Sequence, residues 1–211
     1  MYPLYRFDIE QNTDEWHNIK IGMFSASVTD KLLSGTNTKG FQELISRITE
    51  ERLTGIKSDS IVFAGNKYTE RGHEFEPIAR YDYEYRNLVS VKQVGVIIKD
   101  EWCLCSPDGL IGDNKLIQIK CPIFSTHREY LYLAKNNTDI RKIIPGNYYK
   151  QMQFELYVSG LDINVFTSYH PNLRALDIEV KRDEQMIKEI EDRLVEAKLL
   201  VLNEIEIIKN L

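Results

Sequence analysis

An acid, an amide and an amine lie in the stretch from Cys103 to Pro122, as Asp108, Gln118 and Lys120. Gln118 and Lys120 are two residues apart, so they point to the same face of a strand. A carboxylate is an oxygen ligand that Mg²⁺ accepts, and an ammonium can face an attacking water or a phosphate. The three residues therefore suit metal-assisted hydrolysis of a phosphodiester, provided that the chain brings them together. Polar residues on one face of a strand are ordinarily just exposed, so this pattern alone does not establish a site.

A β-hairpin would bring these residues together. Two short apolar runs flank Gly112-Asp113-Asn114, a cluster that favours a tight turn between strands. Strand periodicity divides the second run between two faces, with Leu116, Gln118 and Lys120 on one and Ile117, Ile119 and Cys121 on the other. Asp108, which follows Pro107, can then face the amide and the amine across the hairpin.

Glu76 is a second candidate carboxylate. It lies in a helical stretch expected from about residue 66 to residue 85, and a helical glutamate is usually solvated. The apolar neighbours of Glu76, among them Phe75, predict that it is partly buried. Glu76 is therefore expected to join Asp108 in holding a divalent cation.

Ser25 and Ser27 open a predicted helix and, with Lys20 one loop away, form a candidate anion site. Backbone N–H groups and hydroxyls at a helix start bind phosphate well. Serine at such a position is more often a helix cap than a phosphate ligand, so the signal is weak when it stands alone.

Composition sets the broad class. With 211 residues, 43% of them hydrophobic, the chain can bury a substantial core, and the lack of repeats or linkers predicts a single domain over residues 1–211. The net charge of −5 does not indicate nucleic-acid binding, but basic residues can still line a DNA path locally. No apolar run is long enough to span a membrane and the opening residues lack a signal-peptide layout, so we expect a cytoplasmic protein without a membrane partner. Three cysteines form neither a zinc set, nor an even disulfide framework, nor a four-thiolate iron–sulfur site, which predicts buried free thiols.

The order of elements follows from periodicity and capping signals. Helices are expected after Asn12, which would cap the first, and at residues 25–33, 41–54, 66–85, 125–134, 148–158 and from Asp183 onward, with Ser125 as a further cap. Strands are expected at residues 93–99, 101–106, 164–169 and 175–181 in addition to the hairpin. This order predicts an α/β sheet core flanked by helices rather than a strictly alternating barrel.

Ser-Pro-Asp-Gly-Leu at 106–110, followed by Gln-Ile-Lys-Cys-Pro at 118–122, resembles the signature of the PD-(D/E)XK nucleases, in the form found in the lambda-exonuclease and YqaJ-type recombination nucleases. Further blocks in a compatible order extend the likeness over most of the chain: residues 16–17, 22–27, 72–79 and 149–153. Several ordered blocks are more specific than one motif. The resemblance implies a restriction-endonuclease-like core, in which a central mixed sheet is flanked by helices.

The resemblance also implies roles at the hairpin. Asp108 would be the principal metal ligand, Gln118 occupies the place of the second acidic ligand, and the backbone carbonyl of Ile119 completes the shell. Lys120 would be the catalytic lysine that orients or activates water, and Glu76 would support the metal site. The cation would be Mg²⁺, with Mn²⁺ as an alternative.

Two further groups of residues are implied in the same way. Gln151 and Gln153 match a glutamine motif beside the scissile strand. Lys20, Ser27 and Ser106 match a pocket for a terminal 5′-phosphate, next to Ser25.

Enzymes of this group degrade one strand of linear duplex DNA in the 5′→3′ direction and leave a 3′ overhang for a single-strand annealing partner. For this chain, the resemblance thus implies a phage- or prophage-encoded exonuclease that acts on double-stranded DNA ends in a bacterial host. A ring-shaped homotrimer is implied by the lambda-type enzymes.

Two positions depart from the pattern. Lys20 stands where the lambda-type enzyme has an arginine, which keeps the charge but loses the bidentate fork and weakens the expected 5′-phosphate preference. Gln118 replaces an acid, and its amide oxygen can ligate a metal but carries no charge. Three explanations are open: a deliberate Glu→Gln change, a natural variant in which Glu76 or Asp113 compensates, or a catalytically silent protein that binds DNA ends and recruits an annealing partner. A related nuclease that cuts internally or on single strands is a further alternative.

Overall fold

The computed structural model describes residues 3–58 and 67–211 of the chain. Its helices are α1 (Asp14–Asn18), α2 (Thr29–Leu32), α3 (Lys39–Thr54), α4 (Lys67–Asn87), α5 (Phe124–Asn136), α6 (Gly146–Ser159) and α7 (Glu184–Lys209), with 3₁₀ turns η1 (Ala26–Val28) and η2 (Ile140–Lys142). Its strands are β1 (Leu4–Arg6), β2 (Phe24–Ser25), β3 (Val91–Lys92), β4 (Val96–Ile98), β5 (Cys103–Cys105), β6 (Gly109–Ile111), β7 (Lys115–Lys120), β8 (Ile163–Ser168) and β9 (Leu176–Lys181). No helix in this part of the chain is long and apolar enough to cross a membrane.

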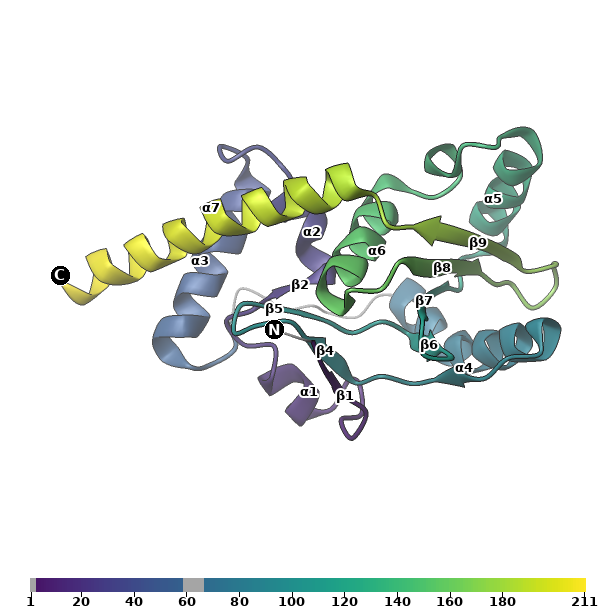
Figure 1. The fold of residues 1–211 in the computed structure, drawn as a ribbon, viewed down its shortest axis with the longest axis horizontal. Coiled ribbons are helices and arrows are strands. Elements are labelled where there is room, and N and C mark those ends of the chain that lie inside the picture. Colours follow the sequence, from purple (N-terminus) through teal and green to yellow (C-terminus); the bar gives the residue numbers. More distant parts are fainter. Residues whose placement is uncertain (1–2, 59–66) are drawn as a thin grey trace.

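The strands form two sheets that lie on either side of α6 (Figure 1). One sheet has the order β1-β4-β5-β2 and the other β3-β6-β7-β8-β9. In the second sheet β7 and β8 are parallel while the other neighbouring pairs are antiparallel, so the sheet is mixed, as expected. Helix α6 contacts β4 and β5 of the first sheet and β8 of the second, which places it at the centre of the architecture.

The expected hairpin is formed by β6 and β7. Ile111 lies opposite Lys115, and Gly112 takes a φ of +56° in the turn between them, a conformation that glycine adopts without steric cost. At the other end of β6, a Cβ on Gly109 would come within 2.4 Å of Val91 Cγ1 of β3. Glycine at this position, directly after Asp108, therefore lets β3 approach β6.

The strand expected at residues 101–106 and the hairpin that follows it lie in different sheets. β5 pairs in the first sheet and β6 in the second. Pro107 lies between them and has no N–H to donate to a ladder, so the chain leaves one sheet and enters the other here. Asp108 consequently lies at the junction of the two sheets.

The side chains of β7 alternate as the sequence predicts. Ile119 packs with Ala79 of α4 on one face of the sheet. Leu116 packs in a different cluster, with Phe154 of α6, on the opposite face. Gln118 is only 3% exposed and belongs to the α6 face by the same alternation, so a polar side chain is buried between β7 and α6.

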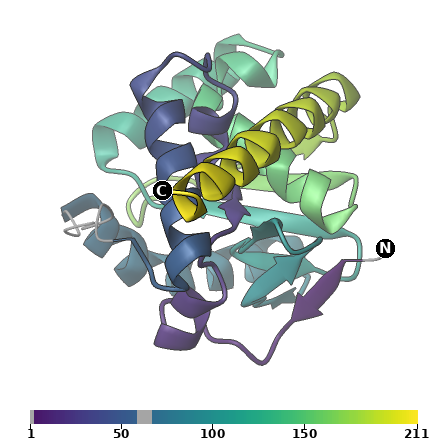
Figure 2. The same cartoon turned by 90° about the vertical axis from the view of Figure 1, so that its left-hand side faces the viewer.

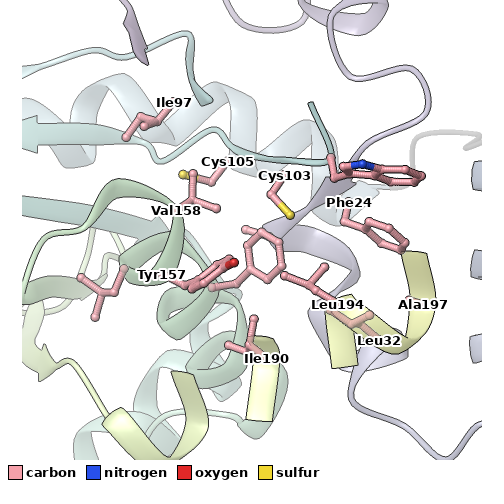
Figure 3. Close-up of a cluster of buried hydrophobic side chains, with 14 of the residues drawn as sticks. Phe24, Leu32, Ile97, Cys103, Cys105, Tyr157, Val158, Ile190, Leu194 and Ala197 are labelled. Carbon is pink, nitrogen blue, oxygen red and sulfur yellow. The ribbon is translucent and has the colours of Figure 1, made fainter. Parts of the chain in front are cut away.

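The larger hydrophobic core fills the space between the first sheet, α3, α6 and α7 (Figure 3). The predicted apolar repeat of α7 supplies its buried side chains: Ile187, Ile190, Leu194, Ala197 and Val201. Figure 2 looks along α7 and shows it crossing α3, with which it is in contact. The three cysteines are free and buried, as predicted.

Several boundaries differ from the predictions. Thr13, not Asn12, caps α1, since its side chain accepts a hydrogen bond from the Trp16 N–H while Asn12 has a φ of +68°. Helix α5 begins after Ile123 without a side-chain cap, so Ser125 is not its cap. Strands β1, β2 and β3 were not predicted, because two or three residues carry no periodic signal. Residue 66, the expected start of α4, lies outside the described residues.

Candidate active site

Asp108 is held by the hairpin that follows it. Its Oδ2 accepts hydrogen bonds from the backbone N–H of Ile119 and from Nε2 of Gln118, both at 2.6 Å. Its own N–H donates to the carbonyl of Ile117 at 3.1 Å. Oδ1 makes no side-chain hydrogen bond within the described residues, so one carboxylate oxygen is fixed and the other is available.

Helix α4 brings a second carboxylate and a guanidinium to the same place. Arg80, 9% exposed, donates to Glu76 Oε1 at 2.5 Å and to the carbonyl of Asp108 at 3.3 Å. Glu76 is half-buried, as its apolar neighbours predict. The i,i+4 pair on α4 therefore sets the position of Glu76 relative to Asp108.

An acidic cleft of about 410 Å³ collects these groups, and its polar lining includes His73, Glu76, Asp108 and Lys120. The Lys120 ammonium lies 4.7 Å from the ring centroid of Tyr148, which also lines the cleft. The cleft thus combines two carboxylates, an amine and an aromatic wall. The carboxylates and the amine belong to the residues that the sequence analysis selected.

The electrostatics of the acidic cleft favour a bound cation. Burial, with a smaller contribution from the nearby Glu76, raises the pKa of Asp108 to about 7, although Lys120 and the Ile119 N–H oppose the shift. A positive charge beside a carboxyl with a raised pKa stabilises its ionised form.

These groups fit the demands of a magnesium ion. Among the described residues, no three His, Cys, Asp or Glu side chains lie close enough to form a dedicated metal cage. Mg²⁺ usually binds through only one or two carboxylates and keeps water and substrate phosphate oxygens in its shell. Asp108, Glu76 and the carbonyl of Ile119, all lining the acidic cleft, supply that kind of incomplete donor set.

The orientation of Gln118 differs from that of a metal ligand. Its Nε2 faces Asp108, and its Oε1 accepts a hydrogen bond from Nε2 of Gln151 on α6 at 2.8 Å. The amide oxygen therefore points toward α6 and not into the acidic cleft. In this arrangement Gln118 supports Asp108 by donating a hydrogen bond to it.

Glu155 is a buried carboxylate that the sequence analysis missed. It is 0% exposed, and its oxygens accept from Gln151 at 3.0 Å and from Nδ2 of Asn164 at 2.7 Å. Burial raises its pKa to about 7, with the nearby Asp108 as the next cause. The signal was present in the sequence, because residues four apart share a helix face and Gln151 had already been assigned to the site.

Gln151 and Gln153 do not act together. Gln153 is 0% exposed, donates to the carbonyl of Lys181 at 2.8 Å and accepts from the N–H of Asp183 at 2.9 Å. It therefore ties α6 to the junction of β9 and α7. Side chains two residues apart on a helix point to nearly opposite sides, so Gln151 reaches β7 and Gln153 does not.

A second, basic cleft of about 730 Å³ lies beside the acidic one. Its charged and hydroxyl-bearing lining includes Lys20, Ser25, Ser27, Lys31, Arg47 and Lys57, with Glu43 and Glu51 as its acids. His73 of α4 lines both clefts, so they adjoin.

The predicted anion residues meet in the basic cleft. Ser25 lies in β2 and makes no capping bond to η1, contrary to the usual role of a serine there, and its Oγ lies 3.1 Å from that of Ser27. Lys20 stacks over Trp16 at 3.5 Å from the ring centroid. Burial and the nearby Arg47 lower the pKa of Lys20 to about 8.

Arg47 is the second residue that the sequence analysis missed. Its side chain is 14% exposed and pairs with Glu51 at 3.4 Å, and burial lowers its pKa. Its Nη2 is buried and has no hydrogen-bond partner among the described residues. A buried donor without a partner at the wall of a cleft is suited to an anionic ligand.

Ser106 is connected to the basic cleft only through the indole of Trp16. Its Oγ lies 3.0 Å from Nε1 of Trp16, and it does not belong to the lining of the basic cleft. Trp16 does line that cleft, so Ser106 fixes the ring over which Lys20 stacks.

Comparisons with known proteins identify the family and the fold of the chain. Residues 15–162 match the sequence profile of the YqaJ-like viral recombinase domain. The alkaline exonuclease LHK-Exo from Laribacter hongkongensis is 30% identical, with a TM-score of 0.78 over 94% of this chain and 97% of that chain. The same enzyme has also been solved in complex with dAMP, with a TM-score of 0.79.

A phage-related exonuclease from Haemophilus somnus shares the fold, with a TM-score of 0.68 at 16% identity, over 88% of this chain and 96% of that chain. An uncharacterized protein of Acanthamoeba polyphaga mimivirus is 31% identical in sequence over an alignment of 114 residues, which covers 47% of this chain and 20% of that protein. This chain thus spans about a fifth of the mimivirus relative.

Proposed function

The chain belongs to the family of YqaJ-like viral recombinase domains and has the mixed α/β fold of PD-(D/E)XK exonucleases, and we propose that it is a metal-dependent 5′→3′ exonuclease on linear double-stranded DNA. The observation that carries the proposal is the adjacency of the two clefts. One contains carboxylates and a lysine suited to cutting, and the other contains cations suited to holding a terminal phosphate. The 3′ overhang left behind would serve recombination by strand annealing.

In the acidic cleft, Asp108, Glu76 and the Ile119 carbonyl would hold Mg²⁺ or Mn²⁺. The cation would supply charge neutralisation at the phosphate and lower the pKa of a water. Lys120 orients that water or offsets the charge that develops on the phosphate oxygens. Gln118 holds Asp108 in place from the side, and Gln151 holds Gln118.

The reaction balances as a simple hydrolysis. The water oxygen forms a bond to phosphorus, the bond from phosphorus to the 3′ oxygen of the terminal nucleotide breaks, and that oxygen takes up a proton. The new end of the strand carries a 5′-phosphate. The basic cleft can hold this phosphate in the next cycle through Lys20, Ser25, Ser27 and Arg47, while Ser106 keeps Trp16 in position.

The complex of LHK-Exo with dAMP supports this assignment, since a nucleoside monophosphate is the kind of product that such a cleft would release. We extend the proposal, on the family resemblance, to a homotrimer around DNA and to a single-strand annealing partner. Light scattering on the purified chain tests the first, and a monomer would remove it.

The experiment is digestion of linear 5′-phosphorylated duplex with Mg²⁺ or Mn²⁺. We expect mononucleotides from the 5′ end, no cutting of covalently closed circular duplex, and loss of activity by at least about 100-fold in Asp108→Asn. Cutting of the closed circle would indicate an endonuclease instead.

A second candidate function is favoured by one observation, the amide nitrogen of Gln118 facing Asp108. A protein with an uncharged, donor-oriented residue there could bind DNA ends and recruit an annealing partner without cutting. That reading predicts tight binding of duplex ends but no metal-stimulated cleavage, in this chain and in Gln118→Glu alike.

A further inference from the structure

Glu155 is a buried acid that the proposed mechanism does not use. Its side chain is fully buried on α6, and its hydrogen-bond partners, Gln151 and Asn164, are both neutral amides. A buried carboxylate is costly unless a positive charge compensates it. Lys120 is one such charge, since it opposes the rise in the pKa of Glu155, and a cation beside Asp108 would be another.

The structure limits the sources of a second negative charge at the metal site. Asp113 lies in the exposed turn of the hairpin, five residues before Gln118 and thus about 16 Å along the strand. Glu76 already counts among the carboxylates of the acidic cleft, and it is paired with Arg80 at 2.5 Å. Neither residue therefore adds a further charge in place of the one that is missing at Gln118.

Gln151 connects Glu155 to that position. Its Nε2 donates to Gln118 Oε1 at 2.8 Å and to Glu155 Oε1 at 3.0 Å, so one amide group serves both residues. Gln118 in turn donates to Asp108 at 2.6 Å. Gln151 could donate the same two hydrogen bonds if the acid stood at position 118 and the amide at position 155.

We propose that Glu155 supplies, through Gln151 and Gln118, the negative charge that position 118 lacks, and that it is a positioning residue for Asp108. The carboxylate has moved from the strand to the facing helix, where it orients Gln151 and adds to the field on a cation beside Asp108. This inference rests on the proposed metal-dependent function.

The test measures Mn²⁺ binding to the full chain in the absence of DNA, with electron paramagnetic resonance as the readout. We expect Glu155→Gln to weaken Mn²⁺ binding by about 10- to 100-fold, the usual effect of a lost supporting residue. The double variant Gln118→Glu/Glu155→Gln, which returns the charge to the strand, should bind close to the wild-type level. Glu189→Gln, an exposed glutamate on α7, is the matched control and should change nothing.

Rescue separates this role from a merely structural one, because a packing defect at Glu155 would not be repaired by a charge at position 118. Circular dichroism verifies that each variant is folded. Unchanged Mn²⁺ binding in Glu155→Gln, or a double variant that binds no better than it, would overturn the inference. If Asp108→Asn also binds Mn²⁺ as the wild type does, the proposed metal site itself is wrong.

Discussion

Gln118 donates a 2.6 Å hydrogen bond from its amide nitrogen to Asp108 Oδ2, which lies where the chain passes from the first sheet into the second. The amide oxygen of Gln118 is bonded to Gln151 of α6, so both ends of this uncharged side chain have partners. On the hairpin, Asp108 is thus supported by an amide and is not paired with a second acid from β7. Several consequences of that difference are measurable.

Replacing Gln118 by glutamate should bring a second carboxylate next to Asp108. Without metal the two charges repel, so the melting temperature at pH 8 should fall, and saturating Mg²⁺ should restore it. Half-maximal cleavage should need about tenfold less Mg²⁺. Differential scanning fluorimetry and a Mg²⁺ titration of activity check both effects. A variant that is neither destabilised without metal nor more responsive to it would show that this position is remote from the cation.

Arg47 should determine how well the chain distinguishes DNA ends. Arg47 lines the cleft that contains Lys20, and its buried Nη2 has no hydrogen-bond partner among the described residues. A hydrogen bond to a charged group contributes about 1.5–3 kcal/mol. Arg47→Ala should therefore lower kcat/KM on a 5′-phosphorylated duplex by about 10- to 100-fold. The same duplex with a 5′-hydroxyl is the control, and its kcat/KM should change little. Equal losses on both substrates would instead indicate damage to the fold.

The pKa of Lys20, lowered to about 8 by burial and by Arg47, predicts a pH dependence. The ammonium loses its charge as pH rises through that value in the free enzyme, so kcat/KM on 5′-phosphorylated ends should decline above pH 8. Lys20→Arg should shift this decline to higher pH, because guanidinium stays protonated and regains the bidentate fork. A pH profile identical in both proteins would assign the decline to another group.

Asp108 and Glu155 both have pKa values raised to about 7, from ordinary values of 3.8 and 4.5. Between those limits the folded state holds protons that the unfolded chain has released, so stability without metal should fall as pH rises from about 4 to about 7. Mg²⁺ should accordingly stabilise the protein more at pH 7.5 than at pH 5. Thermal denaturation in EDTA and in Mg²⁺ across this range measures the effect. In Asp108→Asn/Glu155→Gln the metal-free dependence should flatten, and a wild type whose stability rises over this range would contradict the assignment.

The sequence by itself determined the local parts of this site. The turn at Gly112 and the period of two along β7 put Gln118 and Lys120 on one face and buried Ile119 on the other, because strand geometry leaves no other choice. The helical period similarly determined α7 and its buried repeat. Such features depend on neighbours in the chain, and the sequence records those neighbours.

The tertiary structure decided the rest. Glu155, Arg47 and Arg80 look like solvated helix residues in the sequence, and each enters a candidate site only because its helix packs against a particular strand or loop. The direction of the Gln118 amide depends on Gln151, 33 residues later. No local period encodes a contact at that separation, since it arises only when β7 and α6 are packed together. Packing, and not the motif, therefore decided that Gln118 faces Asp108 as a hydrogen-bond donor.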